Sequence, residues 1–395
     1  MSSNIGPEAK AKYQKYLDAE TLEEKIKRLE EFISAVPKHK GTEKIVALNK
    51  TRLVKLKKEL EGKKQRQKRL GSQVSPFSIK SEGIQVVLVS DYHTPGIGKT
   101  SILNYLTGAK QEQIGKFTVE PQIGIYKFKN INYQIVDMPA IMKDASKGVA
   151  HGREILSAIR SANLVCFCID LSRSVEKQMK LLINEFEEAN IRINKNPPPI
   201  DIKKTGANKI QVLYLTDASK KCQNLDEDIK SLVRESGMQN AIVKVFGEIN
   251  IDDLLDALNP SIVYIKVMIL ATKGDLPETE KQFKILKRKF SEQFPLILGV
   301  SAIKGKGFEK FGQKILDFLG FIKIFTKSGI KVAETPIIME KGASVKDVAL
   351  KIHKNFYEFF KYAVIHRKGT RMKKKRVGLD YLVKNEDIIE IYTTI

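Results

Sequence analysis

The chain of 395 residues contains no tryptophan and only three cysteines, Cys166, Cys168 and Cys222. Three thiols are too few for the disulfide framework of a small secreted protein. Two of them lie in the apolar run LVCFCID, where free thiols are commonly buried. The cysteines therefore exclude a disulfide-stapled fold and give no indication of a metal site.

Long apolar runs are also absent. No stretch reaches the roughly 18 apolar residues of a membrane-spanning helix, and the opening MSSNIGPEAK lacks the apolar core of a signal peptide. With 42% hydrophobic and 29% charged residues, the composition is typical of a folded protein of about two to four domains. We therefore expect a cytoplasmic location and no membrane association.

Acidic residues are scarce near both ends of the chain. Residues 1–80 contain 20 Lys and Arg against 10 Asp and Glu, and residues 323–395 contain 16 against 8, so the ends hold most of the formal net charge of +23. This distribution indicates terminal modules that meet a polyanion, for which RNA is the expected candidate. Solvated lysine-rich surface, as in a thermophilic protein, explains the charge equally well at this point.

The most informative segment is VVLVSDYHTPGIGKTSILNYL, residues 86–106, in which a β-branched run leads through a glycine-containing loop into an apolar-periodic helix. A Walker A motif, GxxxxGK(S/T), has this order: backbone N–H groups hold phosphates, the lysine reaches the β- and γ-phosphates, and the hydroxyl binds Mg²⁺. The loop here is longer, and its first glycine is replaced by His93 if counted by spacing, or by Ser90 if counted from the strand. We expect a nucleotide to contact Gly96, Ile97, Gly98, Lys99, Thr100 and Ser101.

Apolar strand-like runs alternate with amphipathic helical segments from residue 84 onward. This alternation predicts an α/β fold with a doubly wound, mainly parallel sheet and helices on both faces. Strands are predicted at residues 86–89, 123–128, 133–137, 164–169, 267–272 and 296–300. Helices are predicted from residue 99 and at residues 153–161, 175–190, 280–292 and 308–318.

The main domain is predicted to be interrupted by an insertion. Asp170 and Thr272 each end a predicted strand but are 102 positions apart, whereas a βαβ unit needs about 30 residues. We therefore expect a small α+β subdomain at residues 190–261, between the two parts of the main domain at residues 83–189 and 262–322. Within the insertion, the segment IDIKKTGANKIQVLYL predicts a β-hairpin.

The two ends of the chain are predicted to form further modules. Residues 1–72 combine a helical hairpin, expected between residues 8 and 61, with a basic linker that continues to residue 76. Residues 323–395 have the pattern of a β-hairpin, a helix with Ser344 as its N-cap, and further strands. This pattern predicts a compact β-grasp-like domain.

Polar residues that suit a metal ion occur at two further places. Thr118 precedes the strand predicted at residues 123–128, and Asp137 ends the next strand. Together with Thr100, these oxygens can form the Mg²⁺ site of a nucleoside triphosphate. We assign Thr100, Thr118 and Asp137 to the metal, and Lys99, Thr118 and Asp137 to catalysis.

Two later segments can read the base. The segment TKGD contains Thr272, Lys273 and Asp275, which we expect to contact the nucleotide. The Asp275 carboxylate can accept from the N1–H and the exocyclic amine of guanine, a donor pair that adenine lacks. Backbone N–H groups at Ser301 and Ala302 can reach the guanine carbonyl. All these segments follow predicted strands, where ligands bind in open α/β sheets.

The run DMPAIMKDASKGVAHGREILSAIRSANLVCFCID resembles the Obg-related GTPases, and the layout of nearly the full length resembles their developmentally regulated GTP-binding (Drg) branch. The segments IRINKNPPP, IHKNFYEFFKYA and RVGLDYLVKNEDIIEIY support this resemblance. It implies a P-loop GTPase that uses GTP, GDP and Mg²⁺, carries a C-terminal TGS domain, and acts with ribosomes or in translation. It also implies stimulation by K⁺ or by a regulatory protein partner, although Gly96 offers no side-chain oxygen to hold a cation.

Two departures from the family pattern affect the phosphate side. Ala140, which we expect to contact the nucleotide, replaces the glycine of the DxxG element. Ile141 follows where Ras-like enzymes carry a water-orienting glutamine, so we expect slow intrinsic hydrolysis. Lys147, Arg153 and Arg160 are candidates for transition-state charge, but solvated helix surface explains them better.

Two alternative functions remain open at this point. The first is a guanine-nucleotide sensor or scaffold with little hydrolysis, which the altered loop and Ala140 favour. The second is an RNA-binding protein with a vestigial nucleotide site, for which the basic residues 366–376 would be the main contact.

Overall fold

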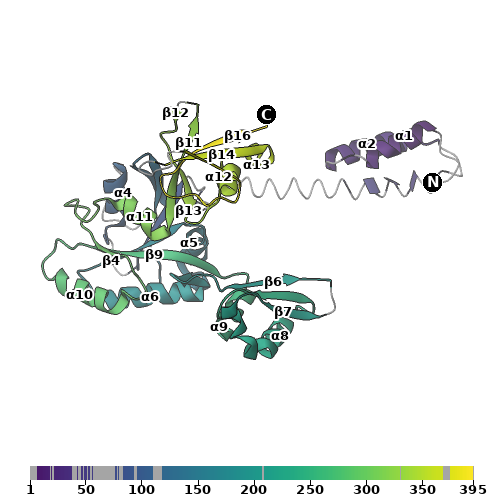
Figure 1. Ribbon diagram of the computed structural model, residues 1–395. Helices are drawn as coiled ribbons and strands as arrows, with labels where there is room; N and C mark the ends of the chain where they lie inside the picture. The colour runs from purple at the N-terminus through teal and green to yellow at the C-terminus, as the bar shows by residue number, and fades with distance from the viewer. Residues whose placement is uncertain are drawn as a thin grey trace. The chain divides into compact units, whose positions relative to one another are not determined.

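The computed structural model forms two compact units, Met1–Ser78 and Ile79–Ile395, which are described separately (Figure 1). The structure describes residues 7–17, 19, 22–37, 42, 46–47, 49–50, 52–53, 56, 76–77, 79, 83–92, 96–109, 118–206, 209–329, 331–367 and 374–394. Among these residues, no helix combines the length and the hydropathy needed to cross a membrane.

The first unit contains helices α1 (Pro7–Leu17) and α2 (Leu22–Ala35), which pack against each other. Apolar residues three or four positions apart on α2 form its inner face, and Leu29 and Phe32 are buried there. Helical structure is therefore found where the sequence predicts it. Most of the second predicted helical segment, residues 43–61, and the linker at residues 63–75 lie outside the described residues.

The large sheet of the second unit is mainly parallel, as predicted. Its strands are β1 (Ile84–Val89), β2 (Gln122–Phe128), β3 (Ile131–Asp137), β4 (Leu164–Asp170), β5 (Ile191–Ile193), β9 (Val263–Thr272) and β10 (Ile297–Gly299). The order is β10-β9-β4-β1-β3-β2, with β5 also paired to β9. Every pair is parallel except β2 with β3.

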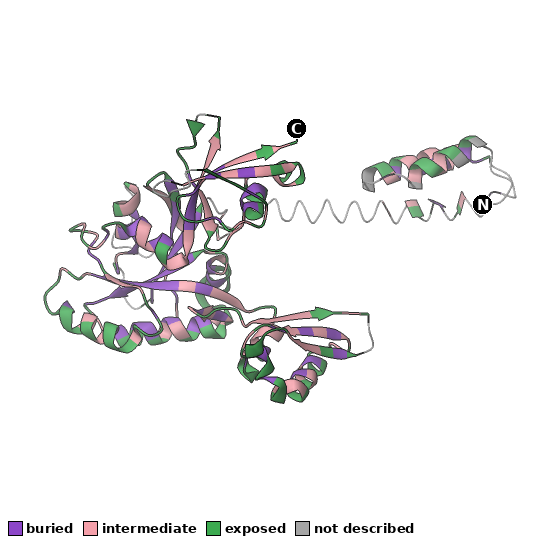
Figure 2. Cartoon of the chain, in the orientation of Figure 1, coloured by how far each residue is buried: buried purple, intermediate pink, exposed green. Residues whose placement is uncertain are grey.

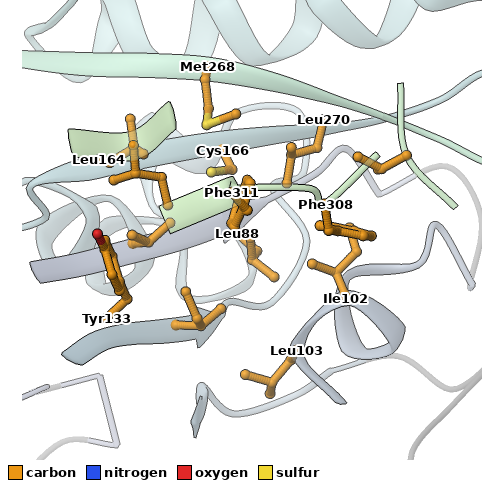
Figure 3. Close-up of a cluster of buried hydrophobic side chains, with 14 of the residues drawn as sticks. Leu88, Ile102, Leu103, Tyr133, Leu164, Cys166, Met268, Leu270, Phe308 and Phe311 are labelled. Atoms are coloured by element: carbon orange, nitrogen blue, oxygen red, sulfur yellow. The ribbon is translucent and has the colours of Figure 1, made fainter. Parts of the chain in front are cut away.

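Helices cover both faces of this sheet. They are α4 (Lys99–Thr107), α5 (Gly152–Ile159), α6 (Val175–Glu188), α10 (Thr279–Phe290) and α11 (Phe311–Leu319), with the short 3₁₀ helices η1 (Ala145–Lys147) and η2 (Val149–His151) before α5. On one face, residues of α4 and α11 pack on β1, β3, β4 and β9, as Figure 3 shows for Ile102 and Phe311. On the other face, Phe186 of α6 meets Phe167 of β4 edge-on, with ring centroids 5.0 Å apart.

Burial on both faces explains the composition of the central strands. All residues of β1 and β4 are buried, as is most of β9 (Figure 2). Strands covered on both faces carry continuous apolar runs rather than an alternating pattern. The run LVCFCID is therefore a core strand, and both of its cysteines are fully buried.

The inserted subdomain has its own sheet and core. It contains β6 (Ile200–Lys204), β7 (Ile210–Tyr214), β8 (Ala241–Val245), α7 (Asp217–Lys220), η3 (Gln223–Leu225), α8 (Asp226–Glu235) and α9 (Ile251–Leu258). The predicted hairpin between β6 and β7 is wrong, because β8 lies between them, antiparallel to β6 and parallel to β7. The three fully buried residues Ala241, Val243 and Val245 make β8 the natural central strand, whereas β6 ends in exposed lysines and forms an edge.

The insertion begins slightly later than residue 190. Residues Ile191–Ile193 form β5, which pairs with β9 and so belongs to the large sheet. The Arg160 guanidinium donates to the carbonyl oxygens of Ala189 and Ser261, and so connects the segments at the two ends of the insertion. This contact gives Arg160 a structural role that the sequence did not indicate.

The C-terminal domain contains β11 (Phe321–Ser328), β12 (Lys331–Val332), β13 (Ile337–Glu340), α12 (Val345–Ile352), α13 (Lys354–Glu358), β14 (Phe360–His366), β15 (Lys374–Val377) and β16 (Ile388–Thr393). Strand β11 pairs with β13, β12 and β16, and β14 lies between β16 and β15. Ser344 is the N-cap of α12, as predicted, and forms a capping box with Asp347. The hydrophobic core of the C-terminal domain is separate from the core of the large sheet.

Candidate functional site

The glycine-containing loop connects β1 to α4 at the carboxyl edge of the large sheet. Gly96 and Gly98 have φ angles of 81° and 105°, a region that favours glycine. Gly98 immediately precedes Lys99, the first residue of α4, and Ile97 is buried beside it. The first N–H groups of a helix have no partner within the helix, so this helix start is suited to an anion such as a phosphate.

Ser90 occupies the position that counting from the strand assigns to the first glycine. The Lys99 ammonium donates to the Ser90 hydroxyl over 2.6 Å, and both side chains are buried. The alternative assignment to His93 lies outside the described residues. Ser90 is therefore an additional site residue, which fixes the direction of the lysine side chain.

The three predicted metal ligands converge on one point. The Thr100 hydroxyl donates to Asp137 Oδ2 over 2.6 Å, and the Thr118 hydroxyl is 3.3 Å from the same oxygen. Asp137 is fully buried, and within the described part of the chain its Oδ1 has no hydrogen-bond partner. Burial raises the pKa of Asp137, and Lys99 and the two hydroxyls oppose this only in part. Two hydroxyls and a buried carboxylate oxygen without a partner are a donor set that fits Mg²⁺.

The base side of the site is formed by the loops after β9 and β10. Because these strands are parallel neighbours, Thr272, Lys273 and Asp275 leave the sheet at the same edge as Ser301 and Ala302. A hydrogen bond from the Ser301 hydroxyl lowers the pKa of Asp275, so this side chain is an ionised acceptor at neutral pH.

A cavity of about 80 Å³ joins the two sides. It is lined by predicted residues from three segments, namely Gly96, Ile97, Gly98 and Ser101, then Thr272, Lys273 and Asp275, then Ser301 and Ala302. The structure thus brings segments separated by about 200 positions around one space. The polar groups suited to phosphate, metal and base follow one another along a single sheet edge.

The segment after β3 is attached to the phosphate loop. Ile141 is fully buried, donates its N–H to the Ser90 carbonyl over 2.8 Å, and forms a bridge with Asp91. A buried aliphatic side chain therefore stands where a water-orienting glutamine would be needed. Ala140 does not have a positive φ, so its Cβ is accommodated without backbone strain.

Two of the three residues considered for stabilising transition-state charge lie on the surface. Lys147 pairs with Asp144 over 2.6 Å and is well exposed, and Arg153 is also exposed. The third, Arg160, binds carbonyl oxygens at the ends of the insertion. None of these contacts indicates a role in charge stabilisation.

Gly152 at the start of α5 fits where no larger residue can. An added Cβ would lie 2.3 Å from the carbonyl oxygen of Ala145 and 2.4 Å from its Cα. We expect Gly152→Ala to lower the free energy of unfolding by about 1–3 kcal/mol, the usual cost of overpacking. Thermal unfolding can test this against Gly378→Ala, where the added Cβ meets no atom within 4 Å. An equal melting temperature for both variants would contradict the prediction.

Sequence reasoning missed Asp170, Arg173 and Asp91. Asp170 ends β4 at the same sheet edge, and its Oδ2 accepts from Lys273 over 2.8 Å. Burial alone would raise the pKa of Asp170, but hydrogen bonds from Lys273 and Ser172 outweigh it and hold the pKa below its ordinary value. The position at a strand end is a signal that could have identified Asp170, whereas no motif marks Arg173 or Asp91.

Comparisons with known proteins agree with this architecture. Three family models match: "50S ribosome-binding GTPase" over residues 94–204, "C-terminal region of MMR_HSR1 domain" over residues 210–321, and "TGS domain" over residues 322–393.

Similar proteins span nearly the whole chain. A GTP-binding protein of Methanocaldococcus jannaschii is 32% identical over 385 residues, covering 95% of this chain and 93% of that protein. The developmentally-regulated GTP-binding protein 1 of Xenopus laevis is 28% identical over 377 residues, covering 93% and 98%. Among solved structures, the YchF GTPase of Schizosaccharomyces pombe is 12% identical, covers 80% of this chain and 99% of that chain, and has a TM-score of 0.45.

Proposed function

The chain belongs to the family of developmentally regulated GTP-binding proteins, and we propose that it binds guanine nucleotides and hydrolyses GTP slowly at the sheet edge described above. One observation carries this proposal: residues of the phosphate loop and of the TKGD and SA segments line one cavity, and the cluster of Thr100, Thr118 and Asp137 lies along the same sheet edge. In open α/β sheets this edge is the position of the ligand site.

The charge arrangement suits a nucleotide with a guanine base. The ionised Asp275 can accept from the N1–H and the exocyclic amine of guanine, whereas adenine has neither donor at these positions and would leave the carboxylate without a partner. Lys99 would move its ammonium from Ser90 to the β- and γ-phosphates.

Thr100, Thr118 and Asp137 would hold Mg²⁺. A bound Mg²⁺ ion neutralises charge that develops on the phosphate oxygens. Thr118 lies in the segment that precedes β2. A contact between its hydroxyl and the metal would therefore order this segment when the γ-phosphate is bound.

Slow hydrolysis follows from the residue after Ala140. Ile141 is buried and bonded to Ser90, so its side chain cannot orient a water molecule. The missing group would come from outside the site, and we propose that the ribosome, a regulatory protein or K⁺ supplies it.

A ribosomal role is further supported by the excess of basic residues at both ends of the chain and by the name of the matching GTPase family model. Action in translation would place the protein in the cytoplasm.

Single-turnover GTP hydrolysis with and without ribosomes tests this proposal. We expect slow phosphate release that ribosomes accelerate and that removal of Mg²⁺ by a chelator stops. Thr118→Ala should slow release at least about tenfold and change GDP affinity by less than about threefold, because its hydroxyl contacts only the metal side of the site. Release that remains undetectable even with ribosomes would support the alternative of a nucleotide sensor or scaffold.

The RNA-binding alternative makes a separate prediction. Lys374–Val377 form β15, paired with β14, and Arg376 stacks 3.9 Å over the ring of Tyr362. The preceding residues 368–373 lie outside the described part. If this hairpin is the main RNA contact, reversing the charge of residues 373–375 should abolish ribosome association regardless of the bound nucleotide.

A further inference from the structure

A largely buried ion-pair network holds the start of the lengthened phosphate loop. The Arg173 guanidinium contacts Asp91 with both terminal nitrogens, Nη2 at 3.0 Å from Oδ1 and Nη1 at 3.4 Å from Oδ2. Its Nε lies 3.5 Å from Oδ2 of Asp170. The side chains of Asp91 and Asp170 are only 2% and 1% exposed, so their charges depend on these partners.

The network continues to the base side of the site. Asp170 Oδ2, which lies near Arg173, also accepts from the Lys273 ammonium over 2.8 Å. Two carboxylates and two cations thus form an electrically balanced group. It connects residue 91 of the phosphate loop with residue 273 of the TKGD segment, which are far apart in the sequence.

The length of the loop gives this network its importance. The loop has three residues more than the Walker A pattern, and a longer loop has more conformations to lose when it closes on a ligand. The backbone of Asp91 is fixed by its bridge to Ile141, and its side chain is fixed by Arg173. A loop held in this way loses less conformational freedom on binding, which increases affinity.

We propose that Arg173 is a positioning residue for nucleotide binding, which holds Asp91, and with it the start of the phosphate loop, in the arrangement that receives the phosphates. The inference rests on the proposed binding of guanine nucleotides at this site. Arg173 acts through Asp91, and through Asp170 the same network joins the phosphate loop to the segment that reads the base.

Titration of the full chain with fluorescent GDP tests this role. Arg173→Ala and Asp91→Asn should each weaken GDP binding about tenfold, and the double variant should bind about as weakly as either single variant, because all three lose the same interaction. Arg173→Lys should recover only part of the lost binding, since an ammonium can pair with one carboxylate oxygen but cannot reproduce the bidentate contact.

A matched control separates positioning from stability. Arg367 and Asp387 form a similar bidentate pair in the C-terminal domain, with side chains 27% and 0% exposed. Arg367→Ala should lower the melting temperature but leave GDP affinity unchanged. Equal GDP affinity in Arg173→Ala, Asp91→Asn and the wild type would overturn the inference, as would a loss no larger than that of Arg367→Ala or no recovery by lysine. A wild-type chain that does not bind GDP would instead overturn the proposed function itself.

Discussion

Replacing Lys99 with alanine is expected to weaken the binding of both GDP and GTP by at least about a hundredfold, since charge-assisted contacts to phosphate are among the strongest polar interactions. Lys99 is 8% exposed and donates to the Ser90 hydroxyl, and its charge opposes the rise in the pKa of Asp137 that burial causes. Its loss removes the cation that meets the phosphates and also leaves Asp137 without its nearest counter-charge. Competition against fluorescent GDP measures the loss.

Another buried lysine provides the control for this variant. Lys323 in the C-terminal domain is 6% exposed and pairs with Glu386 over 3.2 Å. Lys323→Ala should retain the GDP affinity of the wild type, although it also removes a buried ammonium. If Lys99→Ala folds, as judged by circular dichroism, and binds GDP within about threefold of the wild type, the assignment of the phosphate loop is wrong.

Asp275→Asn is expected to change the base preference from guanine toward xanthine by at least about a hundredfold in the ratio of affinities, because an unpaired buried donor or acceptor discriminates strongly. The carboxylate of Asp275, which is ionised with help from Ser301, would accept two hydrogen bonds from guanine. An asparagine amide presents a donor instead, and xanthine offers a carbonyl oxygen at the corresponding position.

Displacement of fluorescent GDP by GTP and by xanthosine triphosphate measures this ratio. Asp217→Asn is the matched control, because the Asp217 side chain lies in the insertion and is 98% exposed. It should leave the preference for guanine unchanged. An Asp275→Asn variant that prefers guanine as strongly as the wild type would show that another group reads the base.

The candidate site residues whose position at the sheet edge the sequence predicted share one property: they lie at or just after the carboxyl ends of strands of a parallel sheet. Asp137 and Thr272 end strands that are largely buried, and Ser301 follows the apolar segment that contains β10. Parallel pairing brings the carboxyl ends of these strands to one edge of the sheet. The order of strands and polar residues along the chain is therefore sufficient to predict where the candidate site lies.

Features that depend on distant pairing could not be predicted in this way. The segments that form β6 and β7 have the pattern of a hairpin, but β8 offers a more apolar strand and lies between them. The contact between Asp91 and Arg173 joins residues 82 positions apart and follows no periodicity. The assignment of Ser90 likewise depended on the side-chain contact with Lys99.

Calorimetric titration of the wild-type chain with GDP, a non-hydrolysable GTP analogue and ATP, all with Mg²⁺, tests the central claim most directly. The account predicts saturable binding of one GDP per chain, binding of the GTP analogue at the same site, and no measurable binding of ATP. Absence of GDP binding, or equal binding of ATP, would contradict the conclusion that this sheet edge is a guanine-nucleotide site.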